Sequence, residues 1–388
     1  MALALLVAVG CDAEEELAPE DLVDDEVEVE KRILNGVDNS SPSYDAVVLV
    51  NGGCTGTLVG DRYVLTAGHC LSPPPVAGGV VPGTWYPLPG VTISIGAERA
   101  APELQVSTTH FNQAGYDDIV LVRLASAVPR TVATPAVPLT AIPGGAAPLS
   151  WLQSQSFTMS GFGLIEGGVL APIRRRATAT VAEFPFVSFG VLQPNMLRAT
   201  GSGCATIQPG DSGSPLLWYD YSTNVRHTVG VAQGVQSCGG RYVVTFGTGG
   251  FDSEGNVKPN IGQWLRTAIP IDFVVDGPIQ LGCTGSGGSP HVSVPVKNQG
   301  LTSGSAWVDV FVGLASAPSI GELSSHFVSS TTLVPGQRKL RSVTIPDSWE
   351  GQSVWIDVLL DTTQSVAEGN EGNNHAEQFV TIPDCSFN

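Results

Sequence analysis

The stretch that constrains this chain most is Gly210–Pro215, which reads Gly-Asp-Ser-Gly-Ser-Pro. Its glycines let the backbone turn tightly around Ser212, which directly follows an acid. A serine hydroxyl is a weak nucleophile at neutral pH, so it needs a histidine base and a carboxylate that orients the base. Interpreting Ser212 as a nucleophile therefore requires a fold that brings distant segments of the chain together.

The sequence contains one strong candidate for each partner. His69 ends the segment Leu-Thr-Ala-Gly-His, which continues a strand-like run that begins at Arg62. Asp118 directly precedes the apolar run 119–124, a pattern typical of a buried strand. Taken singly, a glycine-flanked serine is usually a turn residue and a lone histidine is usually structural. The alternatives are Asp117 as the acid and His110, His227, His291 and His326 as the base, but none of these histidines has a comparable motif.

In the order His69, Asp118, Ser212, the three motifs resemble the trypsin and chymotrypsin family of serine endopeptidases. The resemblance covers about Ile33 to Ile269. The further matches are Arg32-Ile33-Leu34-Asn35-Gly36, His110-Phe111-Asn112, Ser160-Gly161-Phe162-Gly163 and the helix-like Gln263–Ile269. The family implies an all-β, chymotrypsin-like double β-barrel and the hydrolysis of peptide bonds in protein or peptide substrates, with no metal or organic cofactor.

The resemblance also implies the role of each residue in acyl transfer. His69 would take the proton of Ser212 and later give it to the leaving amine, while Asp118 would orient the imidazole. The backbone N–H groups of Gly210 and Ser212 would stabilise the oxyanion. Cleavage after Arg32 would release the ammonium group of Ile33, which would pair with Asp211 and order the oxyanion hole in a zymogen switch.

The substrate pocket departs from the family pattern. Thr206 occupies the position where trypsin-like enzymes carry an acid that binds arginine or lysine, and no acid lies between Cys204 and Gly210. We therefore expect a non-basic residue at the cleavage site, so activation after Arg32 would need a second, trypsin-like protease as partner. Gln233 and Gly234 are expected on the opposite wall, where the family's Ser-Trp-Gly pattern is missing.

The rest of the composition favours an all-β protein. The 388 residues include 46 glycines and 28 prolines, and short apolar runs alternate with turn signals. No apolar run reaches the roughly 18 residues of a membrane-spanning helix. The segment 12–32 holds eleven acids against Lys31 and Arg32, so it cannot bury a core. We interpret it as an acidic pro-segment or as a solvated spacer, and the acidic net charge does not predict a nucleic-acid partner.

The start of the chain predicts export. Residues 1–9 are almost wholly apolar, and Ala8-Val9-Gly10-Cys11 resembles a bacterial lipoprotein signal, although it lacks a basic n-region. Residues 1–11 would then be a signal peptide, and a lipid on Cys11 would anchor the protein to a membrane. The alternative is an ordinary signal peptide and a secreted protein.

Seven cysteines leave one unpaired after three disulfides, and Cys11 is the natural odd one. Cys54 and Cys70 match the family's histidine-loop disulfide. The other expected pairs are Cys204 with Cys238, around the pocket region, and Cys283 with Cys385, around the C-terminal segment. Disulfides fit an oxidising compartment, whereas a metal site would need closer ligand spacing.

A second domain is expected over 277–388, after the first domain at 33–270. Runs such as 291–296 and 353–360 alternate with period two, which predicts strands of an immunoglobulin-like β-sandwich. Residues 366–374 resemble the closing motif of bacterial CARDB modules, which are associated with cell-surface adhesion. This module would bind a surface ligand or serve as a spacer. An alternative for the whole chain is a surface adhesin on a protease-like scaffold.

Overall fold

The computed structural model describes residues 33–71, 83–114, 117–188, 190–251, 257–284, 288–314, 325–361 and 374–385. Cys11, Arg32 and the expected signal and acidic segments lie outside the described residues. Strands predominate, and the described part has two α-helices, α1 (Pro148–Ser154) and α2 (Ile261–Ala268). Short 3₁₀ turns are η1 (Pro42–Tyr44), η2 (Gly68–Cys70), η3 (Pro143–Gly145), η4 (Ser202–Cys204) and η5 (Asp347–Trp349). No described helix combines the length and apolar character needed to cross a membrane.

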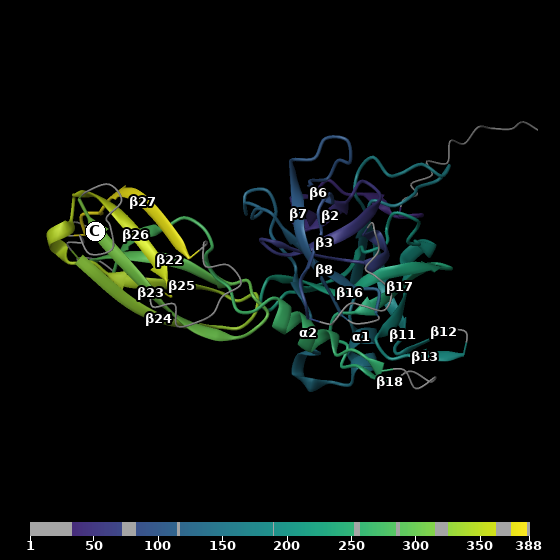
Figure 1. The fold of residues 1–388 in the computed structure, drawn as a ribbon. Coiled ribbons are helices and arrows are strands. Elements are labelled where there is room, and N and C mark those ends of the chain that lie inside the picture. Colours follow the sequence, from purple (N-terminus) through teal and green to yellow (C-terminus); the bar gives the residue numbers. More distant parts are fainter. Residues whose placement is uncertain are drawn as a thin grey trace, which may run out of the picture. The chain divides into compact units, whose positions relative to one another are not determined.

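The first barrel is an antiparallel sheet closed on itself, because its strand β7 pairs with both β6 and β8 (Figure 1). The strand order is β6-β2-β3-β4-β8-β7, and the short β5 pairs with β7. Its strands are β2 (Val47–Val50), β3 (Cys54–Gly60), β4 (Tyr63–Thr66), β5 (Tyr86–Pro87), β6 (Thr92–Ile95), β7 (Leu104–Gln113) and β8 (Val120–Leu124). Closure leaves this barrel without open edges.

The second barrel closes in the same way through pairing of β11 with β14, in the order β11-β10-β15-β16-β17-β14. Its strands are β10 (Phe157–Gly161), β11 (Arg175–Glu183), β14 (Met196–Gly201), β15 (Pro215–Asp220), β16 (Val225–Gln236) and β17 (Gly239–Val244). The flanking strands are β1 (Val37–Asp38), β9 (Val137–Pro138), β12 (Phe186–Ser188), β13 (Val191–Gln193), β18 (Gly250–Phe251) and β19 (Val257–Lys258). These two closed six-stranded rings confirm the double β-barrel.

Apolar side chains fill each barrel and the layer between them. Leu65 and Leu121 of the first barrel, Val231 and Val243 of the second and Trp264 of α2 belong to one buried cluster. Burying such side chains stabilises the fold by about 1.5–3 kcal/mol each. The packing of the two barrels therefore fixes where the loops between them meet.

Helix α2 starts two residues earlier than the sequence indicates, because Asn260 caps it. The Asn260 side chain accepts a hydrogen bond from the Gln263 N–H at 2.8 Å. The apolar side chains recur at helical spacing and bury one face. They are Ile261, Trp264, Leu265 and Ala268. Trp264 Nε1 donates to Asn112 Oδ1 at 2.8 Å, which ties the helix to β7.

The C-terminal domain consists of two four-stranded sheets that share one apolar core. One sheet contains β20 (Phe273–Val275), β21 (Gln280–Cys283), β22 (Pro290–Asn298) and β25 (Arg338–Thr344). The other has the order β24-β23-β26-β27, with β23 (Gly304–Gly313), β24 (Ser325–Leu333), β26 (Ser353–Leu360) and β27 (His375–Thr381). Alternate residues such as Val308, Val310 and Val312 are fully buried, which confirms the period-two pattern of a sandwich. Strand β20 belongs to this domain although it precedes Gly277, the residue at which the sequence analysis begins the domain.

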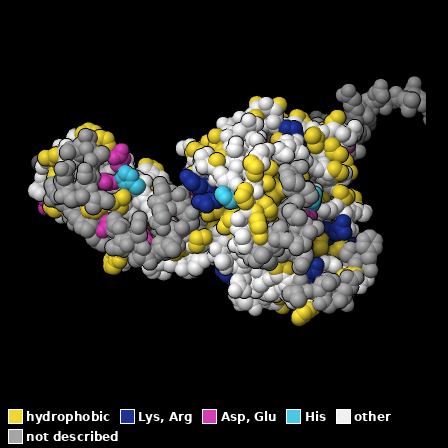
Figure 2. All heavy atoms as spheres, in the orientation of Figure 1, with side chains coloured by type: hydrophobic (Ala, Val, Ile, Leu, Met, Phe, Trp, Pro, Cys, Tyr) yellow, Lys and Arg dark blue, Asp and Glu magenta, His cyan; other side chains and the backbone are white. Residues whose placement is uncertain are grey.

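Basic side chains are sparse on the surface seen in Figure 2. There the lysine and arginine side chains lie in separate small groups instead of one continuous patch. In the described part, Arg174 and Arg175 are almost fully buried. Arg174 forms an ion pair with Asp45 at 3.0 Å, and Arg175 forms one with Asp38 at 3.1 Å. These two guanidinium groups are therefore inside the protein and do not contribute to its charged surface.

Candidate active site

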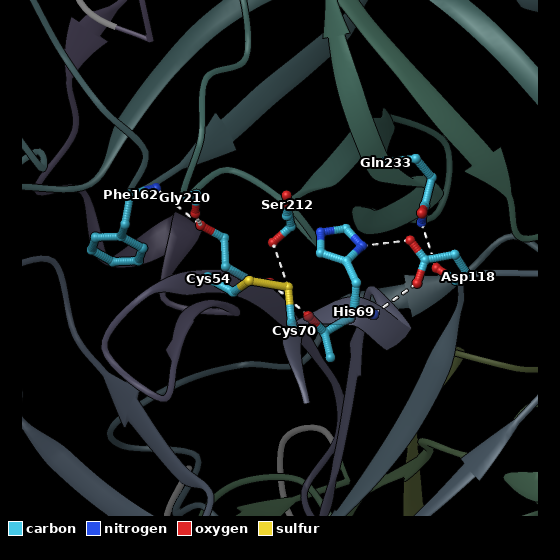
Figure 3. Close-up of a disulfide and its surroundings, with 10 residues drawn as sticks. Cys54, His69, Cys70, Asp118, Phe162, Gly210, Ser212 and Gln233 are labelled. Atoms are coloured by element: carbon cyan, nitrogen blue, oxygen red, sulfur yellow. Dashed lines mark hydrogen bonds and ion pairs between the residues drawn. A yellow bond between two sulfur atoms is a disulfide. The ribbon is translucent and has the colours of Figure 1, made fainter. Parts of the chain in front are cut away.

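His69 and Asp118 lie side by side because the strands that carry them are paired. Thr66, the last residue of β4, is opposite Val120, the first residue of β8. The His69 Nδ1 atom lies 2.5 Å from Asp118 Oδ2, and the His69 backbone N–H donates to Oδ1 at 2.8 Å. Both carboxylate oxygens therefore bind His69, so the position of the imidazole is fixed (Figure 3).

Gly68 permits this close approach, since a Cβ atom there would lie 2.9 Å from Asp118 Oδ1. The hydrogen bond that His69 donates to the Asp118 carboxylate raises the pKa of His69 above its usual 6.5, burial opposes this effect and the charge of Asp118 adds to it. The His69 side chain is still 46% exposed. A base of raised pKa is thus held at an accessible position.

Asp117 is engaged elsewhere. Its Oδ2 accepts a hydrogen bond from Asn195 Nδ2 at 2.8 Å, and Lys258 Nζ lies 3.7 Å from Oδ1. Burial raises the pKa of Asp117. The geometry therefore pairs His69 with Asp118 and gives Asp117 a place in the packing of the second barrel.

Of the other histidines, His110 lies in β7 and His291 in β22 of the C-terminal domain. His227 is stacked on Trp218 with ring centroids 5.3 Å apart, and burial lowers its pKa. His375 Nε2 lies 2.5 Å from Asp357 Oδ1 in the sandwich, and no serine hydroxyl is bonded to His375 within the described ranges. The side chain of His326 lies outside the described residues.

Ser212 sits in the loop before β15, between two glycines with positive φ, Gly210 (96°) and Gly213 (84°). Gly213 leaves no space for a side chain, because a Cβ atom there would lie 2.1 Å from Thr66 Oγ1. Cys70 Sγ lies 3.5 Å from the Ser212 carbonyl oxygen, which places Ser212 beside the residue that follows His69 (Figure 3). No hydrogen bond joins Ser212 Oγ to His69 here, and such bonds often tighten only when substrate binds.

Two backbone donors of this loop are unpaired. Within the described ranges, neither the Gly210 N–H nor the Ser212 N–H donates a hydrogen bond to a protein acceptor. The carbonyl groups of the same two residues are both bound by Thr55, at 2.9 Å each. The loop thus offers two N–H groups to a developing negative charge.

Asp211 is buried next to this loop, with 1% of its surface exposed. Its Oδ1 accepts a hydrogen bond from the Gly163 N–H at 2.7 Å and its Oδ2 one from the Gln208 N–H at 2.9 Å. A Cβ atom on Gly161 or Gly163 would lie 2.2 or 2.4 Å from the Asp211 side chain, which explains the glycines of this segment. Burial raises the pKa of Asp211 to about 6, and no described lysine, arginine or histidine forms an ion pair with it.

Arg99 is a residue that the sequence analysis missed. Its Nη1 donates to the Gly52 carbonyl at 2.6 Å, its Nε to the Ala171 carbonyl at 3.0 Å and its Nη2 to the Phe162 carbonyl. The guanidinium therefore braces the segment that holds Asp211. No motif marks Arg99, because its partners are backbone carbonyls of three distant segments.

The residues expected to line the pocket form hydrogen bonds or pack against other residues of the chain. Thr206 Oγ1 donates to the Cys204 carbonyl at 3.1 Å, and Gln233 Nε2 donates to the Asp118 carbonyl at 2.6 Å. At Gly234 a Cβ atom would lie 2.5 Å from the Arg241 guanidinium. Ile207, which follows Thr206, is 2% exposed and belongs to the core of the second barrel, where a Cβ atom on Gly240 would lie 2.7 Å from Ile207 Cδ1.

All three expected disulfides are present: Cys54–Cys70, Cys204–Cys238 and Cys283–Cys385. Cys54, His69 and Cys70 hold ligand-type atoms within 4.8 Å of one another. Because the two sulfurs are bonded to each other, they are not thiolates and do not form a metal site. The first disulfide instead links the start of β3 to the turn that carries His69.

Comparison with known proteins agrees with this geometry. A family model described as Trypsin matches residues 34–249, which is more than half of the 388 residues. A second model, CARDB, matches residues 271–378. A search of curated proteins found no match. The chain therefore belongs to the trypsin family of serine proteases, which act on proteins or peptides, and carries a C-terminal CARDB domain.

Proposed function

We propose that this protein is an exported, zymogen-type serine endopeptidase that uses His69, Asp118 and Ser212 as its catalytic triad. The observation that carries the proposal is the combination of the 2.5 Å His69–Asp118 contact with the two unpaired N–H groups of Gly210 and Ser212. A base and an oxyanion site beside one serine are the parts that acyl transfer needs.

In the proposed reaction, Ser212 Oγ attacks the carbonyl carbon of the scissile peptide while its proton passes to His69 Nε2. The carbonyl oxygen becomes an oxyanion that the N–H groups of Gly210 and Ser212 stabilise. His69 then protonates the leaving amine as the C–N bond breaks, which leaves an acyl-enzyme on Ser212. Water, activated by His69, hydrolyses the ester and restores the serine.

The surroundings of Asp211 support zymogen activation. This carboxylate is buried, and the described part of the uncleaved chain provides no ion-pair partner for it. Ile33 is also buried, and the Leu34 carbonyl accepts the Thr206 N–H at 2.9 Å, on the segment that leads to Asp211. Cleavage after Arg32 would create an ammonium group on Ile33, which would supply a direct ion-pair partner beside the more distant charges of Arg175 and Arg99.

The raised pKa of Asp211 gives the uncleaved protein a distinctive pH dependence. Between its ordinary value of 3.8 and about 6, the folded protein retains a proton that the unfolded chain has released. The free energy of unfolding should therefore fall as pH rises through this window, by about 3 kcal/mol from this group. Urea unfolding at pH 4 to 6.5 measures this fall in the free energy of unfolding. The proteins compared are uncleaved Ser212→Ala and the same protein that also carries Asp211→Asn. Equal slopes for both proteins would contradict the assignment.

The absence of an acid at the pocket leads to a prediction about activation. Thr206 and Ile207 offer no carboxylate to an arginine side chain, and Ile207 is packed beside Gly240. We expect the purified uncleaved protein to remain intact at Arg32, whereas added trypsin should cleave there. N-terminal sequencing over time measures this. Maturation at Arg32 that Ser212→Ala abolishes would overturn the prediction.

Peptide-library cleavage by the trypsin-treated protein tests the proposed function as a whole. Cleavage should begin only when Ile33 has become the N-terminus, and it should disappear in Ser212→Ala. The library also reveals the residue preferred at the cleavage site, which we expect to be non-basic. No cleavage despite a free Ile33 would refute the endopeptidase assignment.

Export, with or without a lipid on Cys11, is part of the proposal. The three disulfides fit an oxidising compartment. Mass spectrometry of the mature N-terminus from membrane and culture fractions separates the two cases. A diacylglyceryl group on Cys11 indicates anchoring. A mature protein that lacks Cys11, or carries it without a lipid, indicates secretion.

A binding role is the second candidate function. Trp307 and Phe379 of the sandwich are 50% and 56% exposed, and Phe379 is packed against Trp355 with ring centroids 5.3 Å apart. Phe379 lies opposite Trp355 near the start of β26, whereas the Trp307 carbonyl binds the Asp361 N–H beyond its other end, so the two are separate exposed aromatic side chains. If the chain is an adhesin on a protease scaffold, Ser212 should not react with a fluorophosphonate probe. If the sandwich is only a spacer, removing 271–388, which includes β20, should leave secretion and activity intact.

A further inference from the structure

We infer that Thr55 is a positioning residue that holds the oxyanion loop, a role that rests on the proposed function and extends it. Thr55 lies in β3 of the first barrel, whereas the loop belongs to the second barrel and is far away in sequence. Its side chain is fully buried. It touches neither the nucleophile Oγ nor the base, so it would act through the loop.

Thr55 binds the carbonyl groups of both residues whose N–H groups are unpaired. Its Oγ1 donates to the Gly210 carbonyl at 2.9 Å, and its backbone N–H donates to the Ser212 carbonyl at 2.9 Å. The Asp211 N–H, on the far side of the Gly210–Asp211 peptide, donates to the Gln208 carbonyl at 2.8 Å. That peptide group is therefore held at both ends, which fixes the orientation of the adjoining donors.

The same hydroxyl also accepts a hydrogen bond from the Phe162 N–H at 3.1 Å. It thereby joins the Gly210 loop to the segment that binds Asp211 through Gly163. The Thr55 carbonyl in turn accepts a hydrogen bond from Thr66 Oγ1 at 2.8 Å, at the end of β4 just before the His69 turn. One residue thus connects the oxyanion loop, the segment that binds Asp211 and the strand leading to the base. Its hydroxyl makes the contacts to Gly210 and Phe162, and its backbone makes those to Ser212 and Thr66.

We call the two hydrogen bonds from Thr55 to the Gly210 and Ser212 carbonyl groups the clamp. The conformation of Gly210 explains why the loop needs it. Its φ of 96° lies in a region that glycine tolerates, so without the clamp the loop has other conformations available. A donor displaced by about 1 Å can cost on the order of 10²-fold in rate. We therefore expect the hydroxyl of Thr55 to matter for the transition state and not for substrate binding.

Thr57 provides a matched control on the same face of β3. It is also a fully buried threonine, but its Oγ1 has no hydrogen-bond partner within the described ranges. Replacing an unbonded buried hydroxyl with a methyl group is neutral or stabilising. The pair Thr55→Val and Thr57→Val therefore isolates the clamp from the general cost of altering a core threonine.

The first experiment measures kinetics of the cleaved enzyme on a peptide substrate chosen from the library. Thr55→Val should lower kcat by roughly 10–100-fold, with KM within about twofold, and weaken a peptide boronate inhibitor by a similar factor. The acidic limb of the pH profile should stay in place, since His69 is untouched. Thr57→Val should behave like the parent, and Thr55→Ser, which keeps the hydroxyl, should recover most of the activity.

Thr55→Val that matches Thr57→Val in kcat would overturn the inference. An increase in KM with unchanged kcat would also overturn it, because the effect would then lie in substrate binding. A shift of the acidic limb of the pH profile would overturn it as well, because the effect would then lie in the base. If Thr55→Val is not recovered in folded form, Thr55→Ala and Thr57→Ala replace the pair.

A second experiment needs no catalysis, so it separates this inference from the proposed function. Amide hydrogen exchange of peptides that span 208–214 should be faster in Thr55→Val than in Thr57→Val, both in the Ser212→Ala background. Equal exchange would refute the clamp even in an active enzyme. Faster exchange in a protein without Ser212-dependent turnover would retain the clamp and refute the endopeptidase.

Discussion

Ser212→Ala is expected to lower kcat by about 10⁶-fold, the largest effect that any single side chain of this protein should have. The substitution removes the atom that forms the acyl-enzyme, while the His69–Asp118 pair and the backbone donors stay in place. Turnover of the peptide substrate by the trypsin-cleaved protein measures the loss. A fluorophosphonate probe should label the parent and leave the variant unlabelled.

Ser214 supplies the matched control for this prediction. It lies two residues further along the same loop, is 1% exposed and has an Oγ without a partner in the described part of the chain. Ser214→Ala should therefore keep kcat within a few-fold of the parent and retain labelling. Equal losses in Ser212→Ala and Ser214→Ala would mean that the loop, and not the Ser212 hydroxyl, carries the activity.

Asp118→Asn is expected to lower kcat by about 10⁴-fold. An asparagine keeps the shape of the side chain but loses the charge that stabilises the imidazolium and selects the tautomer. Because the Asp118 hydrogen bond is the main cause of the raised His69 pKa, any residual activity should show its acidic limb at lower pH than the parent. The pH dependence of kcat/KM measures both effects, since only neutral His69 acts as a base.

Asp117→Asn is the control for this second prediction. Asp117 is the neighbouring carboxylate, but it contacts Asn195 and Lys258 instead of His69. Its substitution should change thermal stability and leave the acidic limb in place. If Asp117→Asn moved the limb and Asp118→Asn did not, the assignment of the triad carboxylate would be reversed.

Much of the site could be predicted from the sequence because it depends on local chemistry. Glycines at 210 and 213 mark a backbone that only glycine tolerates, and both have positive φ in the structure. The alternating pattern of the C-terminal runs reflects the pleat, which sends successive side chains to opposite faces. The Cys54–Cys70 pair followed from the family motif, and the other two pairs were expected because their cysteines enclose the pocket region and the C-terminal segment.

The pocket was less predictable, because its chemistry depends on which partners the side chains contact in the folded protein. Gln233 was expected on the opposite wall of the cleft, and its side-chain amide donates to the Asp118 carbonyl at 2.6 Å, a contact that no motif predicts. The packing of Ile207 against Gly240 and the bracing by Arg99 involve residues without any motif. Such contacts are set by the closed barrels and not by neighbours in sequence.

By itself, the sequence predicted the fold class, the Cys54–Cys70 pair and the three residues proposed for catalysis, because short motifs around these residues resemble those of a known family. The other two cysteine pairs, 34 and 102 residues apart, were expected from the segments that they enclose. Only the tertiary structure decided which groups meet across the barrels. Thr55 shows this most clearly: nothing local distinguishes it from Thr57, yet only Thr55 binds the oxyanion loop. The physical reason is that hydrogen bonds between distant segments depend on how closed sheets pack, and a linear pattern does not contain that information.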